Sequence, residues 1–165
     1  MLLKLMNTQN EYSLALARVI LGVVFFAHGA QKMFGWFDGS GFSGTISEFV
    51  KFGMPVAVAL FAIFVEFLGG LSLLFGLLSR LAALAIIVEM IGAVLTIHIH
   101  IGFFMNWVGD QKGEGFEYHL IAIALAFLIM VRGAGALSID YMVSSRNFRR
   151  NREGSARYPD LAKAS

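Results

Sequence analysis

The sequence predicts an all-α integral membrane protein, a bundle of four transmembrane helices. Of its 165 residues, 58% are hydrophobic and 15% are charged, whereas soluble domains carry about 45–50% apolar and about 25% charged residues. The mean hydropathy is +0.73. A helix needs about 20 apolar residues to cross the hydrocarbon core of a bilayer, and four segments of this kind are present. This excess of apolar surface requires lipid to cover it.

The four predicted spans are separated by turn residues and polar connections. They cover about residues 13–36, 55–78, 81–104 and 118–138. Pro55 lies in the first turn of the second span, where its missing N–H costs little, and Gly76 to Arg80 predicts a tight hairpin into the third span. The chain therefore divides into an N-terminal segment 1–12, a transmembrane domain 13–141 and a basic tail 142–165.

The two longer connections, 37–54 and 105–117, are rich in glycine and polar residues. In the first of them, Phe42, Ile46 and Phe49 recur at helical spacing between polar residues, which indicates a short helix lying in the membrane interface. An ordinary capped loop is the alternative. Neither connection is a phosphate-binding loop, because no strand precedes it and no GK[ST] sequence follows. We expect flexible loops over a cavity that faces outward.

The distribution of basic residues predicts the orientation in the membrane. Lys4, Arg18, Arg80, Arg132 and the basic tail fall on one side, against Lys32, Lys51 and Lys112 on the other. We therefore expect both termini in the cytoplasm. Six of the 13 basic residues lie in the last twenty, where anionic lipid headgroups or a cytosolic partner protein would attract them. The formal net charge is only +2, so no nucleic-acid partner is expected.

The absence of cysteine restricts the chemistry of the chain. Disulfides, thiolate-ligated iron–sulfur clusters and every thiol-based redox cycle are excluded. The four-helix enzymes that exchange electrons between quinones and thiols are therefore excluded as well.

Three ionisable residues are predicted to form a layer near the centre of the bundle: Arg18, Glu66 and Glu89. Such residues cost about 2.5–3.5 kcal/mol each on insertion scales and usually face the interior. Glu66 could relay protons, or the three side chains could form an ion-pair network that fixes how the helices dock. Gly69 and Gly70 would allow another backbone to approach beside Glu66.

A second layer, nearer the outside, contains His28, Lys32, His100, Glu117 and His119. Helical spacing places His100 in one stripe with Glu89, and it points His98 nearly the opposite way. His28 and Lys32 lie one turn apart, so both would face the same cavity.

Three interpretations of this outer layer remain open. The histidines could supply hydrogen bonds to a bound molecule, or they could simply bond to lipid headgroups. Imidazole and carboxylate groups also suit a metal ion or haem. No diagnostic spacing such as HExxH is present, so a metal or haem is the weaker alternative and no metal ligands are assigned.

Several motifs occur in a fixed order along residues 14–141. They are Arg18-x3-Gly22, HGAQKMFGWF at 28–37, Phe49 with Gly53-x-Pro55, Glu66-x2-Gly69-Gly70, Gly76-Leu77-x2-Arg80, His100-x-Gly102-Phe103-Phe104, Gly115-x-Glu117-Tyr118 and Gly133-x-Gly135-x2-Ser138-x-Asp140. No single motif is specific, but the ordered set resembles the DoxX family of small bacterial four-helix membrane proteins.

The resemblance implies a redox role in the bacterial inner membrane. Family members have been linked to thiosulfate oxidation with quinone as acceptor, to catechol or quinone detoxification, and to complexes with superoxide dismutase and a sulfurtransferase. We expect a membrane subunit that binds a quinone or similar lipophilic electron carrier in the outer half of the bundle. The alternative is a non-catalytic assembly or anchoring subunit. Membrane lipids and either other subunits or further copies of the chain are the expected partners.

The residues assigned to this expected function come from both layers. Glu66, His28 and His100 are predicted to be catalytic. His28, Lys32, His100, Glu117 and His119 are predicted to contact the carrier.

Overall fold

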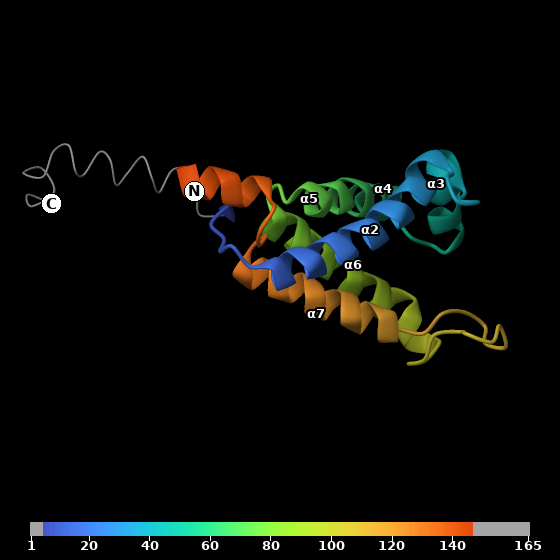
Figure 1. Ribbon diagram of the computed structural model, residues 1–165. Helices are drawn as coiled ribbons and strands as arrows, with labels where there is room; N and C mark the ends of the chain where they lie inside the picture. The colour runs from blue at the N-terminus through green and yellow to red at the C-terminus, as the bar shows by residue number, and fades with distance from the viewer. Residues whose placement is uncertain (1–4, 147–165) are drawn as a thin grey trace, which may run out of the picture.

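The computed structural model describes residues 5–146, and within this range the chain is α-helical with no strand (Figure 1). The elements are α2 (Tyr12–Phe34), α3 (Gly41–Lys51), α4 (Val56–Phe64), the π-helical segment η1 (Val65–Gly69), α5 (Gly70–Phe75), α6 (Ser79–Thr96), the short 3₁₀ segment η2 (His98–His100) and α7 (Glu117–Arg132). A further helix covers 139–146. Most of the predicted basic tail lies outside the described residues.

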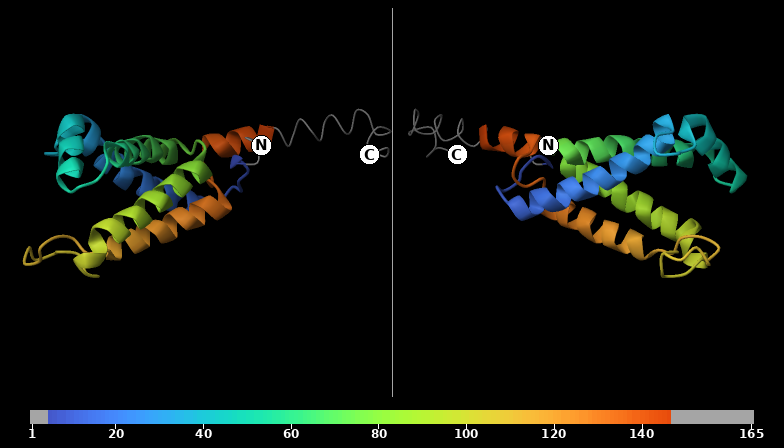
Figure 2. Two further views of the ribbon diagram at one scale, coloured as in Figure 1. Left: turned by 180° about the vertical axis from the view of Figure 1, so that it is seen from behind. Right: turned by 45° about the vertical axis from the view of Figure 1, so that its right-hand side comes forward.

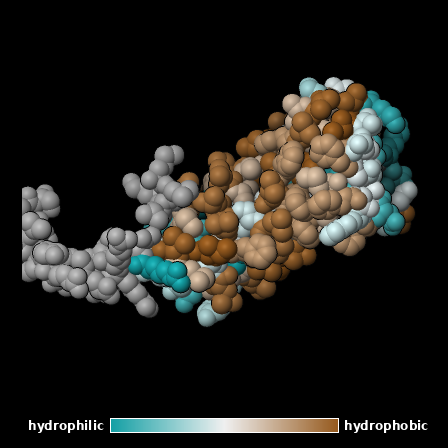
Figure 3. Space-filling view, turned by 90° about the horizontal axis from the view of Figure 1, so that it is seen from above, coloured by the Kyte–Doolittle hydropathy of each residue, from teal (hydrophilic) through white to brown (hydrophobic). Residues whose placement is uncertain are grey.

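Among residues 5–146, three helical stretches are long and apolar enough to cross a membrane, namely Tyr12–Phe34, Val56–Phe75 and Ser79–Thr96. Helix α7 is shorter, at 16 residues. Large apolar side chains such as Leu16, Phe64 and Val88 lie exposed on the outside of the bundle. Figure 3 shows this apolar surface along the molecule, with hydrophilic residues gathered towards its ends. The bundle therefore carries the apolar exterior expected of a membrane protein.

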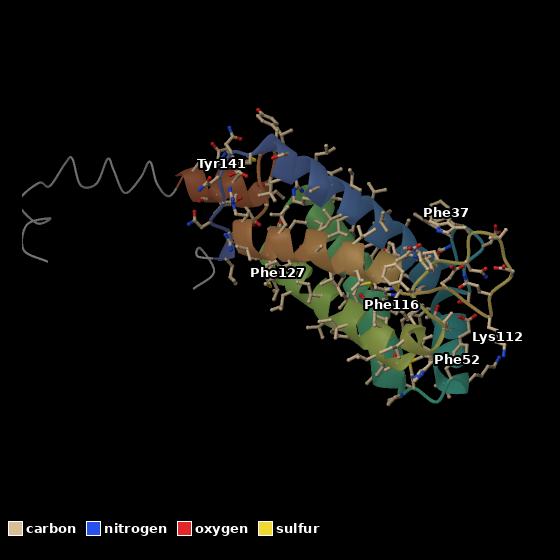
Figure 4. All side chains as sticks on the ribbon, turned by 90° about the horizontal axis from the view of Figure 1, so that it is seen from below. Phe37, Phe52, Lys112, Phe116, Phe127 and Tyr141 are labelled. Atoms are coloured by element: carbon tan, nitrogen blue, oxygen red, sulfur yellow. The ribbon has the colours of Figure 1, made fainter. Side chains whose placement is uncertain are left out.

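The two ends of the bundle differ in construction. The hairpin end carries the turn 76–78 and the chain segments 5–11 and 139–146, and the loop end carries α3, η2 and the segment 101–116 (Figure 1). In Figure 4, Tyr141 marks the hairpin end, Phe52 and Lys112 mark the loop end, and Phe127 lies between them. Gly76 closes α5 in the left-handed conformation, with φ of 65°. The hairpin predicted from Gly76 to Arg80 is therefore confirmed.

Two predicted helix ends are wrong. The third helix ends at Thr96 and does not continue to residue 104, because Ile97 leaves helical geometry at φ −122° and ψ −61°. Several β-branched residues occur between 96 and 101, and such residues lose side-chain freedom in a helix. The fourth helix ends at Arg132 and not at 138, because Gly133 adopts φ 93° and ψ −161°.

Glycine brings α2 into backbone contact with the second span. A Cβ atom built on Gly29 would collide with the backbone of Phe67, and one built on Gly70 would collide with the backbone of Phe26. The close approach predicted for Gly70 is confirmed. It holds the loop-end half of α2 directly against η1, which carries Glu66.

Arg18 does not pair with Glu66, so that predicted interaction is wrong. Arg18 is 1% exposed, and its guanidinium group donates to backbone carbonyl oxygens of Leu74 at 2.9 Å, Ala134 at 2.8 Å and Leu137 at 3.1 Å, as well as to Leu73. Leu73 and Leu74 lie in the last turn of α5, where carbonyl groups lack partners within the helix, and Ala134 and Leu137 lie in the non-helical segment after α7. Its role in the described structure is to tie α2 to the hairpin end.

Candidate functional site

A cavity of about 590 Å³ lies in the loop-end half of the bundle, lined by α2, α3, α4, η1, α6 and the start of α7. It exists because α6 packs against α5 and η1 but diverges from α4 towards the loop end (Figure 2). Most of its wall is apolar, including Phe25, Phe49 and Phe61. Cavities of about 300–1,000 Å³ with apolar walls and a few polar groups are typical of small-molecule sites.

Lys32 and Glu66 form an ion pair in this cavity, with Lys32 Nζ 2.6 Å from Glu66 Oε2. Their side chains are 24% and 9% exposed. Lys32 starts nearer the loop end, and its long aliphatic stem allows the ammonium group to reach inward along apolar surface. The close contact of α2 with η1 at Gly29 brings the two side chains together. Lys32, and not Arg18, is therefore the partner of Glu66.

Glu89 on α6 faces the same cavity from the opposite wall. It is 9% exposed, and its carboxyl group lies within electrostatic reach of Glu66 and Lys32. One of its oxygens, Oε2, is buried without a hydrogen-bond partner. Two buried carboxyl groups thus lie near a single ammonium group, which pairs with Glu66, and Glu89 Oε2 is left without a hydrogen-bond partner.

The backbone around Glu66 is π-helical, a local widening of the helix from Val65 to Gly69. Such segments are rare and frequently occur at functional sites. Here the wide turn directs Glu66 into the cavity while Gly70 still faces the backbone of α2. No feature of the sequence predicts this segment.

His98 and His119 meet at the loop-end wall of the cavity. Their ring centroids are 4.1 Å apart. His98 Nδ1 lies 2.7 Å from the backbone oxygen of Glu114. A carbonyl oxygen can only accept, so Nδ1 carries the hydrogen and, in the neutral ring, Nε2 keeps a lone pair. His119 is 6% exposed, and its Nδ1 is buried without a partner.

The cavity contains some of the predicted site residues but not all of them. His28, Lys32, Glu66 and His119 line it. His100 does not; it lies exposed in η2. Since α6 ends at Thr96, helical spacing no longer applies at residues 98 and 100, and the predicted directions of the two histidines are reversed: His98 lines the cavity.

Glu117 is also absent from the cavity lining. Its Oε1 accepts from Met105 N at 3.0 Å and from Trp107 Nε1 at 3.2 Å. Glu114 Oε2 similarly accepts from Asn106 N at 2.7 Å. These two carboxylates fold the segment 101–116 against the start of α7. Within residues 5–146, no group of three or more His, Cys, Asp or Glu side chains is arranged to hold a metal ion.

Comparison with known proteins identifies relatives over most of the chain. The "Putative oxidoreductase CatD" of Bacillus subtilis is 31% identical over 125 residues, which are 76% of this chain and 89% of the relative. The "Inner membrane protein YqjF" of Escherichia coli is 26% identical over 141 residues, covering 86% of this chain and 99% of the relative. The "Uncharacterized membrane protein Rv3486" of Mycobacterium tuberculosis is 27% identical over 150 residues, covering 87% and 88%. No solved structure matches.

The family comparison agrees with these relatives. The family model described as DoxX matches residues 13–99, a range that includes the helices carrying Lys32, Glu66 and Glu89. Relatives named as inner membrane proteins cover 86% and 77% of the chain. The chain therefore belongs to the DoxX family.

Proposed function

We propose that the chain is a membrane subunit of a redox system and that its loop-end cavity binds a quinone-type lipophilic electron carrier. The observation that carries this proposal is the cavity itself: an apolar chamber whose polar end contains the partly exposed Lys32 and the buried Glu66 and Glu89. The name of the CatD relative, an oxidoreductase by description, points to the same class of chemistry.

The proposal includes a four-span arrangement in which α7 is the fourth span. Its 16 residues extend about 24 Å at 1.5 Å per residue, somewhat less than the roughly 30 Å core. Helix α7 packs along α6 and α2 and exposes apolar residues such as Ile121 and Phe127. Arg132 at one end and Glu117 at the other would reach the two interfaces. The hairpin end, with the basic residues, faces the cytoplasm in this arrangement.

Access from the lipid phase favours a carrier that is itself dissolved in the membrane. The gap between α4 and α6 is bordered by Val58, Phe61 and Val88, which are 42%, 42% and 54% exposed. A ring could enter through this gap while its hydrocarbon tail remains among lipid chains. A water-soluble substrate would gain nothing from an apolar entrance on the side of the bundle.

The residues at the polar end fit the headgroup of such a carrier. A bound quinone would supply two-electron chemistry coupled to proton transfer. The Lys32 ammonium group and the Tyr118 hydroxyl group can donate hydrogen bonds, and Glu66 and Glu89 can hold or transfer protons. The unpartnered oxygen of Glu89 and nitrogen of His119 are the groups that a ligand would satisfy. Electrons would enter from a co-substrate or from a partner subunit.

The decisive experiment is to measure quinone retained by protein purified in native lipid nanodiscs. Gly92 lines the cavity, and a Cβ atom at this position meets nothing within 4 Å, so Gly92→Phe should fill the cavity without disturbing the packing. Leu84→Phe, at an exposed position on the same helix, is the matched control. We expect mass spectrometry to find near-stoichiometric quinone with the parent and with Leu84→Phe, and little with Gly92→Phe. Equal retention by all three proteins would refute the proposal.

An assembly or anchoring subunit is the second candidate function. The observation that favours it is a shallow apolar groove of about 490 Å³ on the outside of α4, α5 and α6. Ala57, Ala82 and Ala85 lie in this groove, and small residues allow transmembrane helices to approach closely. A stoichiometric partner protein in the same purification, with no quinone, would support this function instead.

A further inference from the structure

We propose that the cavity also binds a lipophilic quaternary ammonium ion, and that Glu89 gives up a proton to form an ion pair with it. Glu89 on α6 lines the cavity and is 9% exposed, and its Oε2 is buried without a hydrogen-bond partner. This proposal goes beyond the carrier site, because it names a second class of ligand and does not require the first.

The charges at the polar end of the cavity leave Glu89 without a counterion. Among the described residues that line the cavity, Lys32 is the only lysine or arginine, and its Nζ lies 2.6 Å from Glu66 Oε2. If Glu89 were ionised as well, this apolar chamber would hold two negative charges beside one positive charge, which is costly away from water. Glu89 therefore keeps its proton in the absence of a further cation.

An organic cation that enters the cavity can take the place of this proton. When Glu89 loses a proton and a monovalent cation binds beside it, the total charge of the group is unchanged. The proton leaves to bulk water, and the Glu89 carboxylate pairs with the cation. A buried ion pair is stable only if no donor is left unsatisfied. A quaternary ammonium ion meets this condition, because it has no N–H group.

The walls of the cavity suit an organic cation. Phe25, Phe49 and Phe61 line it, and Tyr118, at the start of α7, lies within electrostatic reach of Glu89. The faces of aromatic rings attract ammonium groups, and this attraction is stronger away from water. The apolar entrance between α4 and α6 admits the hydrocarbon groups of a lipophilic cation.

The test uses phenyltrimethylammonium and its neutral isostere tert-butylbenzene, in which carbon replaces the charged nitrogen. The full-length protein in nanodiscs is titrated in weakly buffered solution, and released protons and bound ligand are both measured against empty nanodiscs. Because binding replaces a proton, we expect close to one proton released per bound cation and an affinity that rises with pH. tert-Butylbenzene should release no proton.

Variants identify the group that loses the proton. The other titratable side chains lining the cavity are His28 and Lys32 on α2, Glu66 on η1, His98 on η2, Glu114 in the segment 101–116, and Tyr118 and His119 on α7. Glu89→Gln should abolish proton release and weaken cation binding at least about tenfold, whereas Glu89→Asp should still release a proton. Glu48→Gln, at an exposed position of α3 outside the cavity lining, is the matched control and should behave as the parent.

Infrared spectra of the parent protein give a second measurement that needs no variant. Cation binding should remove a carboxylic acid C=O band and add carboxylate bands, so the question is decided even if Glu89→Gln fails to fold. Cation binding with an unchanged acid band, or proton release that persists in Glu89→Gln, would overturn the proposal. Failure of the parent to bind the cation would also overturn it. Near-stoichiometric quinone retention would in that case still support the carrier site, because the two measurements use different ligands.

Discussion

Arg18 and Asp140 hold the turn between α5 and α6 from its two sides. Arg18 donates to the carbonyl groups of Leu73 and Leu74 at the end of α5. Asp140 accepts from the backbone N–H groups of Leu78 at 2.8 Å and Ser79 at 3.0 Å, where α6 begins. The last carbonyl groups and first N–H groups of helices have no partners within the helix, and these two side chains supply them. The hairpin end is thereby fixed, at the opposite end of the bundle from the cavity.

Replacing Arg18 with methionine should destabilise the bundle strongly. The substitution keeps an apolar stem of similar length but removes the donors to the carbonyl groups of Leu74, Ala134 and Leu137. A buried carbonyl group left without a donor costs about 1–3 kcal/mol. We expect a loss of at least about 3 kcal/mol in reversible unfolding in detergent. Arg132→Gln is the control, because the Arg132–Glu11 ion pair is exposed and such pairs contribute about 0–1 kcal/mol. Comparable stability of the two variants would contradict the buried role of Arg18.

Gly70→Ala should separate α2 from the second span. The added Cβ atom would collide with the backbone of Phe26, and backbone cannot move aside as a flexible side chain can. Overpacking of this kind costs about 1–3 kcal/mol, measurable as a lower melting temperature in detergent. Gly92→Ala on α6 meets nothing within 4 Å and should be neutral or slightly stabilising, because alanine favours helix over glycine. If both variants melted at the same temperature, the close contact at Gly70 would be disproved.

A double-mutant cycle should detect the ion pair of Lys32 and Glu66. Lys32→Met strands two carboxyl groups, and Glu66→Gln leaves the ammonium group without its 2.6 Å partner. The double variant removes both charges, so it should lose less stability than the sum of the single variants, with a coupling of about 0.5–3 kcal/mol. Because Lys32 is partly exposed, we expect a coupling energy near the lower end of this range. Strict additivity in the unfolding free energies would show that the two side chains do not interact.

Cysteine labelling should establish the orientation of the bundle. The chain has no native cysteine, so single-cysteine variants need no altered background. Val108 at the loop end is 85% exposed, and Asn10 at the hairpin end is also exposed. In intact cells, an impermeant thiol reagent should modify Val108→Cys but should modify Asn10→Cys only after lysis. The reverse pattern would place the loop end in the cytoplasm.

Features that depend on local composition could be predicted from the sequence. Long apolar runs indicated the helices, Gly76 indicated the hairpin, and the spacing of Phe42, Ile46 and Phe49 indicated the helix that the structure describes as α3. Gly70 could be predicted to contact another backbone, because a small residue in a transmembrane span allows a neighbouring helix to approach closely. Each of these predictions follows from residues close together in the chain.

Features that depend on distant contacts could not be predicted. Depth along a helix suggested Arg18 as the partner of Glu66, but depth locates the Cα atom and not the end of a long side chain such as Lys32. The apolar run after Thr96 resembled a continuing helix. In the structure the helix ends there, and His98 forms a hydrogen bond with the backbone oxygen of Glu114, sixteen residues later. The directions of His98 and His100 were consequently reversed.

The π-helical segment η1 carries one residue more than an α-helical turn would. In an α-helix each residue advances the direction of its side chain by about 100°, and a single wide turn absorbs an extra residue without changing the directions of Val56–Phe64 and Gly70–Phe75 on either side of it. Deleting one residue from 65–69 would therefore restore an ordinary α-helix, with Gly70 still facing α2 and the carbonyl groups of Leu73 and Leu74 still facing Arg18. The change would fall within the turn, at the residues that surround Glu66. The polar end of the cavity could thus be altered while both ends of the bundle stay in place.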